Sequence, residues 1–91
     1  MIVVRKDLNM RKGKIGAQVA HASLGAVLKS KKEVAKNHLI LAMDEELESW
    51  LSNSFTKIVV SCDSLAELLE LEKQAKQLGI RNCLITDAGN T

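Results

Sequence analysis

The fold of this chain is organised around one stretch, Asp7-Leu8-Asn9-Met10-Arg11-Lys12-Gly13-Lys14-Ile15-Gly16-Ala17-Gln18-Val19-Ala20-His21-Ala22. It follows a short apolar run at positions 2–4, and it places three cations within four residues. On a helix of about 100° per residue, Lys14, Gln18 and His21 fall within roughly 60° of one another. An apolar seam lines another face of the same helix: Ile15, Val19, Ala22 and Ala26. This separation predicts a site on one side of the helix and a sheet on the other.

The composition is that of a small globular domain with an aliphatic core. The chain has 91 residues, 46% hydrophobic and 26% charged, with no proline and with Trp50 and Phe55 as its aromatic residues. We expect a single domain over residues 1–91. Cys62 and Cys83 form no C-x-x-C pair, which predicts small apolar side chains in a reduced compartment.

Charge and hydropathy bound the class of protein. The net charge is +2, and five of the thirteen cations lie in the first fourteen residues, an excess that can serve phosphate binding or simply be solvated. No signal peptide and no apolar run long enough to span a bilayer is present, so we expect a cytoplasmic protein with no membrane partner.

Periodicity predicts the order strand, helix, helix, strand, helix, strand. We expect strands at residues 2–5, 55–62 and 83–85, and helices at 14–30, 39–51 and 64–78. Residues 29–37 are basic and polar and are expected to connect the first two helices. Ser64 and Glu67 fit a capping box, and Gly79 is a typical C-terminal stop. This order predicts an α/β fold with a mainly parallel sheet and right-handed crossovers.

Two glycines inside the first helix are costly for a helix and therefore suggest a packing or functional reason. Gly16 lies with Ala20 and Ser23 on a side that would approach a sheet closely. Gly25 lies on the stripe of Lys14, Gln18 and His21, where a missing side chain leaves room for a ligand or for close contact with another helix.

The loops after the first and third strands should meet at the carboxyl edge of the sheet, where open α/β folds bind ligands. The polar residues there are candidates for a site: Lys14, Gln18, His21, Asp87 and Thr91. A carboxylate beside an ammonium could activate water, an amide could stabilise an oxyanion, and backbone N–H groups at residues 13–15 could bind an anion. Hydrolysis of an acyl compound carrying phosphates fits this set. The alternatives are a structural histidine, solvated lysines and an ordinary turn aspartate.

These residues resemble the archaeal/eukaryotic-type peptidyl-tRNA hydrolases, the second family with that activity. The likeness begins with Val3-Val4-Arg5-Lys6-Asp7-Leu8 and continues through Lys12-Gly13-Lys14, Ala17-Gln18 and Ala20-His21-Ala22. It resumes at Phe55-Thr56-Lys57-Ile58-Val59-Val60 and ends on Asp87-Ala88-Gly89 followed by Thr91. It therefore covers nearly the whole chain.

The resemblance implies a three-layer α/β/α fold and hydrolysis of the ester between peptide and tRNA, with no metal or organic cofactor. Carried over, the catalytic positions are Lys14 and Asp87, with Gln18 and Thr91 placing water and the carbonyl group and His21 supporting the site. The resemblance also implies that cations and a glycine meet the tRNA backbone: Arg5, Arg11, Lys12 and Gly13.

The chain also departs from the family pattern. Family members continue past the position of Thr91 through a further strand and a final helix, so we expect a C-terminally shortened domain with three strands. An exposed sheet edge would favour a homodimer. The competing hypothesis is a non-catalytic relative that binds tRNA or a protein partner.

Overall fold

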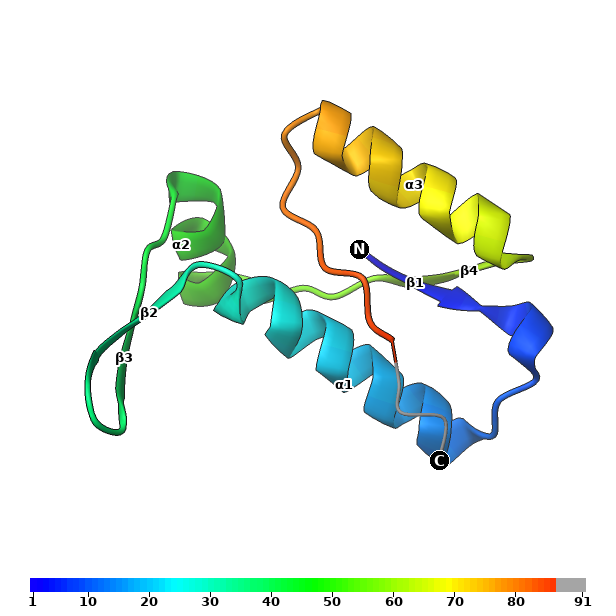
Figure 1. Cartoon of the computed structure of the whole chain (residues 1–91), viewed down its shortest axis with the longest axis horizontal. Helices are drawn as coiled ribbons and strands as arrows, with labels where there is room; N and C mark the ends of the chain where they lie inside the picture. The colour runs from blue at the N-terminus through cyan, green and yellow to red at the C-terminus, as the bar shows by residue number, and fades with distance from the viewer. Residues whose placement is uncertain (87–91) are drawn as a thin grey trace.

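The computed structural model describes residues 1–86 of the chain. The elements follow in this order: β1 (Ile2–Arg5), the 3₁₀ turn η1 (Lys6–Leu8), α1 (Lys12–Leu28), β2 (Lys31–Ala35), β3 (His38–Leu41), α2 (Glu45–Ser52), β4 (Val59–Cys62) and α3 (Leu65–Gln77). In Figure 1 the strands β1 and β4 lie between α3 and α1, and both helices contact β1. The α/β class expected from the sequence is confirmed.

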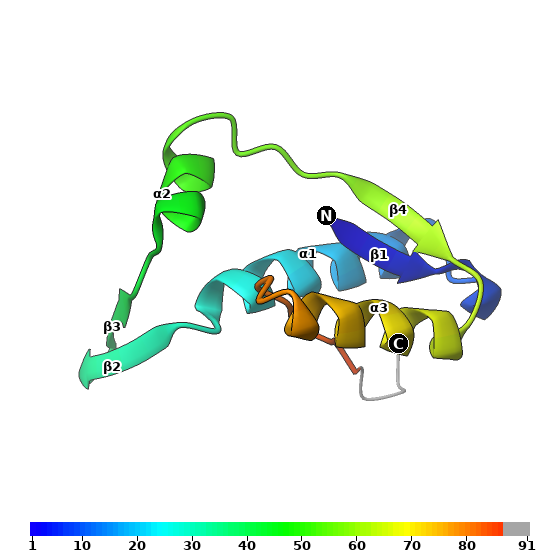
Figure 2. The same cartoon turned by 90° about the horizontal axis from the view of Figure 1, so that it is seen from above.

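The central pairing is parallel. Ile2 pairs with Val59 and Arg5 with Cys62, and the Ile2 amide also donates to the Ile58 carbonyl at 2.7 Å. Parallel strands need a long connection, which here is made by α1, a hairpin and α2. Figure 2 shows that the hairpin and α2 stand away from the strands and from α3. No helix of residues 1–86 is long and apolar enough to cross a bilayer.

The expected connection at 29–37 and the first part of the expected helix at 39–51 are wrong. Residues 31–41 form an antiparallel hairpin, β2–β3, whose register shifts between Glu33 and Ala35. Asn37 turns the chain at φ 65°, a left-handed conformation that asparagine tolerates well. The helix begins only at Glu45, where the Asp44 carboxylate accepts from the Leu47 amide at 2.8 Å.

The other boundaries differ for local reasons. The helix α1 begins at Lys12 rather than Lys14 and ends at Leu28. The strand expected from Phe55 begins only at Val59. Phe55 has φ 52°, which is incompatible with a strand, and its ring packs 4.6 Å from that of Trp50.

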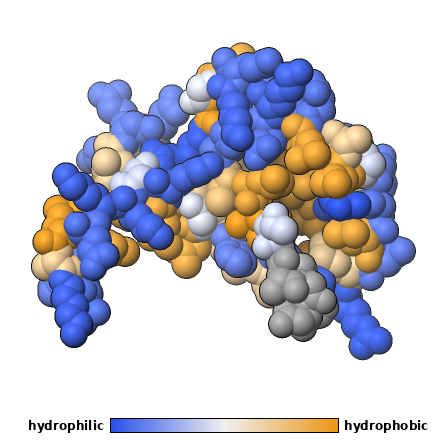
Figure 3. Space-filling model, in the orientation of Figure 1, coloured by the Kyte–Doolittle hydropathy of each residue, from blue (hydrophilic) through white to orange (hydrophobic). Residues whose placement is uncertain are grey.

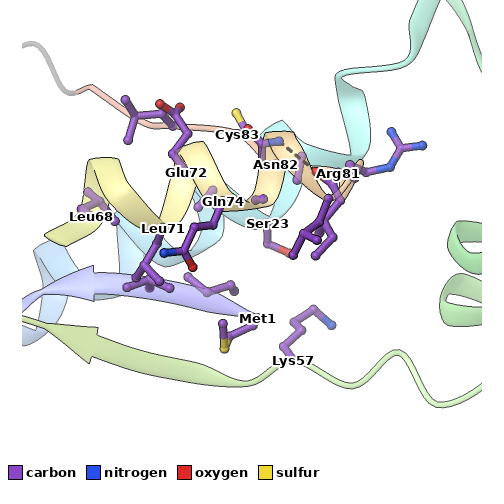
Figure 4. Close-up of a pocket in the computed structure, with 18 of the residues that line it drawn as sticks. Met1, Ser23, Lys57, Leu68, Leu71, Glu72, Gln74, Arg81, Asn82 and Cys83 are labelled. Carbon is purple, nitrogen blue, oxygen red and sulfur yellow. Dashed lines mark hydrogen bonds between the residues drawn. The ribbon is translucent and has the colours of Figure 1, made fainter.

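The third strand expected at 83–85 is absent, because this segment is attached to α1 and not to β1. The Lys29 ammonium donates to the Asn82 carbonyl at 2.8 Å, and the Arg81 guanidinium donates to the Ser30 hydroxyl at 2.5 Å. A cavity of about 450 Å³ lies between this segment, β1, α1 and α3. Figure 4 shows Met1 and Lys57 on the strand side of the cavity and Asn82 and Cys83 on the opposite side.

The core is small. Among the described residues only Leu47 and Cys62 are buried apolar side chains, and many others stay about half exposed, including Ile58, Val59 and Ile80. Cys62 and Cys83 are both free thiols, as expected. Figure 3 shows hydrophobic residues gathered over the middle of the molecule. Local hydrogen bonding therefore carries a large share of the order of individual elements.

Both ends of α3 illustrate this local ordering. The Ser64 hydroxyl accepts from the Glu67 amide at 3.1 Å, while the Glu67 carboxylate accepts from the Asp63 amide at 3.1 Å, one residue earlier than in the standard capping box. At the other end, the Ile80 amide donates to the Ala75 carbonyl at 2.8 Å and Gly79 has φ 70°. This is the Schellman arrangement, which favours glycine.

Two glycine-to-alanine changes should shift stability in opposite directions. Gly79→Ala should lower the free energy of unfolding by about 1 kcal/mol, because alanine is strained at a positive φ. Gly16→Ala should raise it by roughly 0.5–1 kcal/mol, because a Cβ there would meet none of the described residues within 4 Å. Urea unfolding followed by circular dichroism measures both. Destabilisation of equal size at the two positions would contradict the described ends and packing of α1 and α3.

Candidate active site

The carboxyl ends of β1 and β4 lie side by side, and an ion pair joins the segments that leave them. Lys6 follows β1 and Asp63 follows β4, with the Lys6 ammonium 2.9 Å from the Asp63 carboxylate. The hydrogen bond from Lys6 to Asp63 raises the pKa of the Lys6 ammonium. This contact fixes where the chain turns from the sheet toward α1.

The turn itself is held by a second pair. The Arg5 guanidinium donates to both oxygens of the Asp7 carboxylate, at 3.1 Å from Nε and 2.7 Å from the terminal nitrogen. This hydrogen bond lowers the pKa of the Asp7 carboxyl below its usual value of 3.8 and raises that of Arg5. Asn9 then reverses the chain at φ 51°, and its amide donates to the Lys6 carbonyl at 3.2 Å.

The N-terminus of α1 is cationic and has no side-chain cap. Arg11 occupies the N-cap position and makes no side-chain capping hydrogen bond, and the first turn has no acidic residue. Lys12 and Lys14 add two cations to the end of the helix that already carries a partial positive charge. Backbone N–H groups and cations at a helix N-terminus favour a nearby anion, so the arrangement suits a phosphate or a developing oxyanion.

Further along α1, the predicted stripe is present on a continuous helix. Lys14 and Gln18 are half-buried and each is engaged in an interaction, whereas His21 is exposed. His21 lies seven residues beyond Lys14, which is about 10 Å along the helix axis. The predicted residues Asp87 and Thr91 lie outside the described residues.

The two glycines of α1 differ from expectation. Among residues 1–86, a Cβ at Gly16 would meet nothing within 4 Å, so the close approach to the sheet predicted there is wrong. A Cβ at Gly25 would lie 3.1 Å from the Cys83 sulfur and 3.5 Å from Ile85 Cδ1. The missing side chain at Gly25 therefore makes room for the segment that follows α3, and not for another helix.

Comparison with known proteins identifies the family of this chain. Residues 1–91 match the family model described as peptidyl-tRNA hydrolase PTH2. The chain belongs to this family. A peptidyl-tRNA hydrolase of Methanopyrus kandleri is 44% identical over 91 residues, covering all of this chain and 70% of that protein. One of Sulfolobus acidocaldarius is 42% identical over 90 residues, covering 99% of this chain and 72% of the relative. A probable peptidyl-tRNA hydrolase 2 of Dictyostelium discoideum is 40% identical over 91 residues, which are 39% of its length.

Within this PTH2 family member, the structure brings some predicted residues together and separates others. Arg11, Lys12, Gly13 and Lys14 all lie in the cap and first turn of α1. Arg5 lies at the end of β1, where its guanidinium is paired with the Asp7 carboxylate. Within residues 1–86, no group of three or more His, Cys, Asp and Glu residues could hold a metal ion.

Sequence reasoning missed two features. The first is the Lys6–Asp63 pair, although the rule that parallel strands end at the same edge places both residues there. The second is the basic hairpin of residues 31–41, whose apolar residues also fit a helical spacing. The turn residue Asn37 between two short runs was the available signal.

The Arg5–Asp7 pair should make stability fall with acid. The folded pKa of Asp7 lies below its unfolded value, so the contribution of the pair is present above about pH 4 and is lost as the pH falls through the folded pKa. Asp7→Asn should therefore lower the urea midpoint at neutral pH and weaken its dependence on pH between about 2 and 6. Glu48→Gln on α2 is the matched control and should keep the wild-type dependence. Identical pH profiles for wild type and Asp7→Asn would refute the ion pair in solution.

Proposed function

We propose that this chain hydrolyses the ester bond between the peptide and the tRNA of peptidyl-tRNA. The observation that carries the proposal is the family match over residues 1–91, together with relatives named peptidyl-tRNA hydrolase that are about 40% identical across the whole chain. The chain is accordingly a hydrolase whose substrate is peptidyl-tRNA. Because ribosomes produce this substrate, we place the activity in the cytoplasm.

We assign binding of the tRNA backbone to the N-terminus of α1. Arg11 and Lys12 supply charge, and the backbone amide of Gly13 belongs to the first turn, where N–H groups have no partner within the helix. These groups would bind phosphates next to the 3′ end of the tRNA without reading its sequence. Arg5 contributes less charge to this surface, because its guanidinium is already paired with Asp7.

We assign the reaction to the stripe of Lys14, Gln18 and His21, which begins in the first turn of α1. Water attacks the ester carbonyl carbon, the bond to the ribose oxygen breaks, and a proton is delivered to that leaving oxygen. Lys14 is proposed to stabilise the oxyanion and to hold the Asp87 carboxylate ionised, so that the carboxylate can activate the water. Gln18 and Thr91 are proposed to place the water and the carbonyl group. His21, about 10 Å from Lys14 along the helix, is assigned a supporting role.

A second candidate function has its own observation. The cavity of about 450 Å³ beside β1 and the half-exposed apolar residues are features that a binding partner could cover. A non-catalytic relative would bind tRNA or a protein with this surface and release no product. Turnover therefore distinguishes the two functions.

Replacing Lys14 should abolish most of the activity without unfolding the chain. We expect wild type to release tRNA from N-acetylated aminoacyl-tRNA, and Lys14→Ala to be slower by about 10²–10³-fold, the effect of losing one preorganised group that stabilises an oxyanion. Lys73→Ala on the exposed face of α3 is the control and should keep the wild-type rate. Release of no product by wild type would refute the hydrolase function, while an unchanged rate for Lys14→Ala would refute only the role of Lys14.

We also propose that two copies associate through an exposed edge of the sheet that β1 and β4 form. Within the described residues, β1 pairs with β4 on one side only, and the adjoining Met1 side chain is exposed. Sedimentation at tens of micromolar should give the mass of a dimer. A single monomeric species at that concentration would contradict this proposal.

A further inference from the structure

We propose that the hairpin β2–β3 is an RNA-binding arm that contacts the phosphates of the double-stranded stem adjoining the 3′ end of the substrate tRNA. The inference rests on the proposed function, because it names a second contact of the same substrate. It concerns residues 29–41, which the comparison with the family does not single out.

Within residues 1–86, the hairpin is almost entirely exposed. Every residue of β2 is exposed, as are residues 38–40 of β3. Figures 1 and 2 show it projecting from the C-terminal end of α1, away from β1, β4 and α3. A two-stranded hairpin without further packing is only marginally stable in water. An arm of this kind gains most of its order when a partner binds.

The charge of the arm specifies the partner. Lys31, Lys32 and Lys36 lie on it together with a single acidic residue, Glu33. Lys31 and Lys32 are consecutive strand residues, so their side chains project from opposite faces of the ribbon. Within residues 1–86 neither lysine makes an ion pair. The ribbon therefore presents a lysine on each of its faces, with Glu33 on the same face as Lys31.

Positive charge on both faces fits an RNA duplex better than a flat surface. The major groove of A-form RNA is deep and narrow, and phosphates line both of its sides. A ribbon at such a groove can place one lysine near each strand, which gives affinity without reading base sequence. The exposed apolar residues Val34, Leu39 and Ile40 could instead contact a protein, but the excess of lysine over acid favours RNA.

The arm also lies in line with the candidate active site. Lys14, Gln18, His21 and Gly25 share one side of α1, and a hollow of about 470 Å³ continues from there to the arm. Its lining includes His21, Lys29 and Lys31. The helix has 17 residues and spans about 25 Å. A stem that leaves the ester near Lys14 and runs along α1 would thus reach the arm with its backbone.

The test compares two double variants with the same change in net charge. Lys31→Gln/Lys32→Gln removes the arm's cations, and Lys73→Gln/Lys76→Gln removes two exposed cations from α3. Binding of deacylated tRNA is measured over a range of salt concentrations, and hydrolysis is measured at saturating substrate. For the arm variant we expect about tenfold weaker binding at low salt, a log–log salt slope smaller by about 2, and an unchanged maximal rate. The α3 variant should bind like wild type.

Further measurements keep the outcomes distinct. Lys31→Arg/Lys32→Arg should restore binding, and addition of tRNA to the wild-type chain should shift the amide resonances of residues 29–41. Equal tRNA binding by wild type and the arm variant, with hydrolysis intact, would refute RNA binding by the arm and leave the proposed function in place. The exposed apolar residues of the arm would then serve a protein partner. Binding that depends on the arm without any hydrolysis would support the arm and refute the hydrolase function.

Discussion

The parallel pairing of β1 with β4 is the constraint on which the rest of the structure depends. Because both strands run in the same direction, the segments that leave them emerge at one edge, where Lys6 and Asp63 form an ion pair at 2.9 Å. The chain must also cross from the end of β1 to the beginning of β4, and α1 makes the first part of that crossing. The N-terminus of α1 is thereby placed beside the edge at which α/β proteins bind their ligands.

The proposed site rests on the positive charge at this helix end. Arg11 and Lys12 lie where the helix itself contributes partial positive charge, and the first turn of α1 holds no acidic residue. Such an arrangement lowers the stability of the isolated helix end and raises its affinity for anions. Peptidyl-tRNA has phosphates beside its reacting ester. The phosphates would bind at the N-terminus of α1, and the oxyanion that develops from the ester would lie near Lys14. The lysines of the hairpin β2–β3 are proposed to bind further phosphates at the other end of α1.

The sequence predicted the features that depend on local chemistry. β1 matched its expected bounds, the Ser64–Glu67 cap and the Gly79 stop are present, and Lys14, Gln18 and His21 lie on one helix. The prediction from sequence failed where one apolar pattern fits both a helix and a strand. The spacing of Leu39, Ile40 and Met43 fits a helix. Asn37, at φ 65°, instead turns the chain so that Leu39 and Ile40 pair with β2.

The remaining errors come from tertiary contacts that no local pattern encodes. Residues 83–85 have the composition of a strand, yet Lys29 and Ser30 hold the adjoining Asn82 and Arg81 at the end of α1, and the edge of β1 faces a cavity instead. Gly25 adjoins Cys83 for the same reason. The family resemblance could be read from the long block of residues 3–22, but the positions of Asp87 and Thr91 lie outside the described residues.

The central claim is that the reacting ester lies at the first turns of α1, beside the carboxyl ends of β1 and β4. Its most direct test is to bind a non-hydrolysable, amide-linked peptidyl-tRNA analogue to the isotopically labelled chain and to map the amide resonances that shift. The account predicts that the largest shifts fall on residues 11–21, with the adjoining residues 5–9 affected to a lesser degree. Shifts confined to α3 or to the amino ends of β1 and β4, with α1 unaffected, would contradict it.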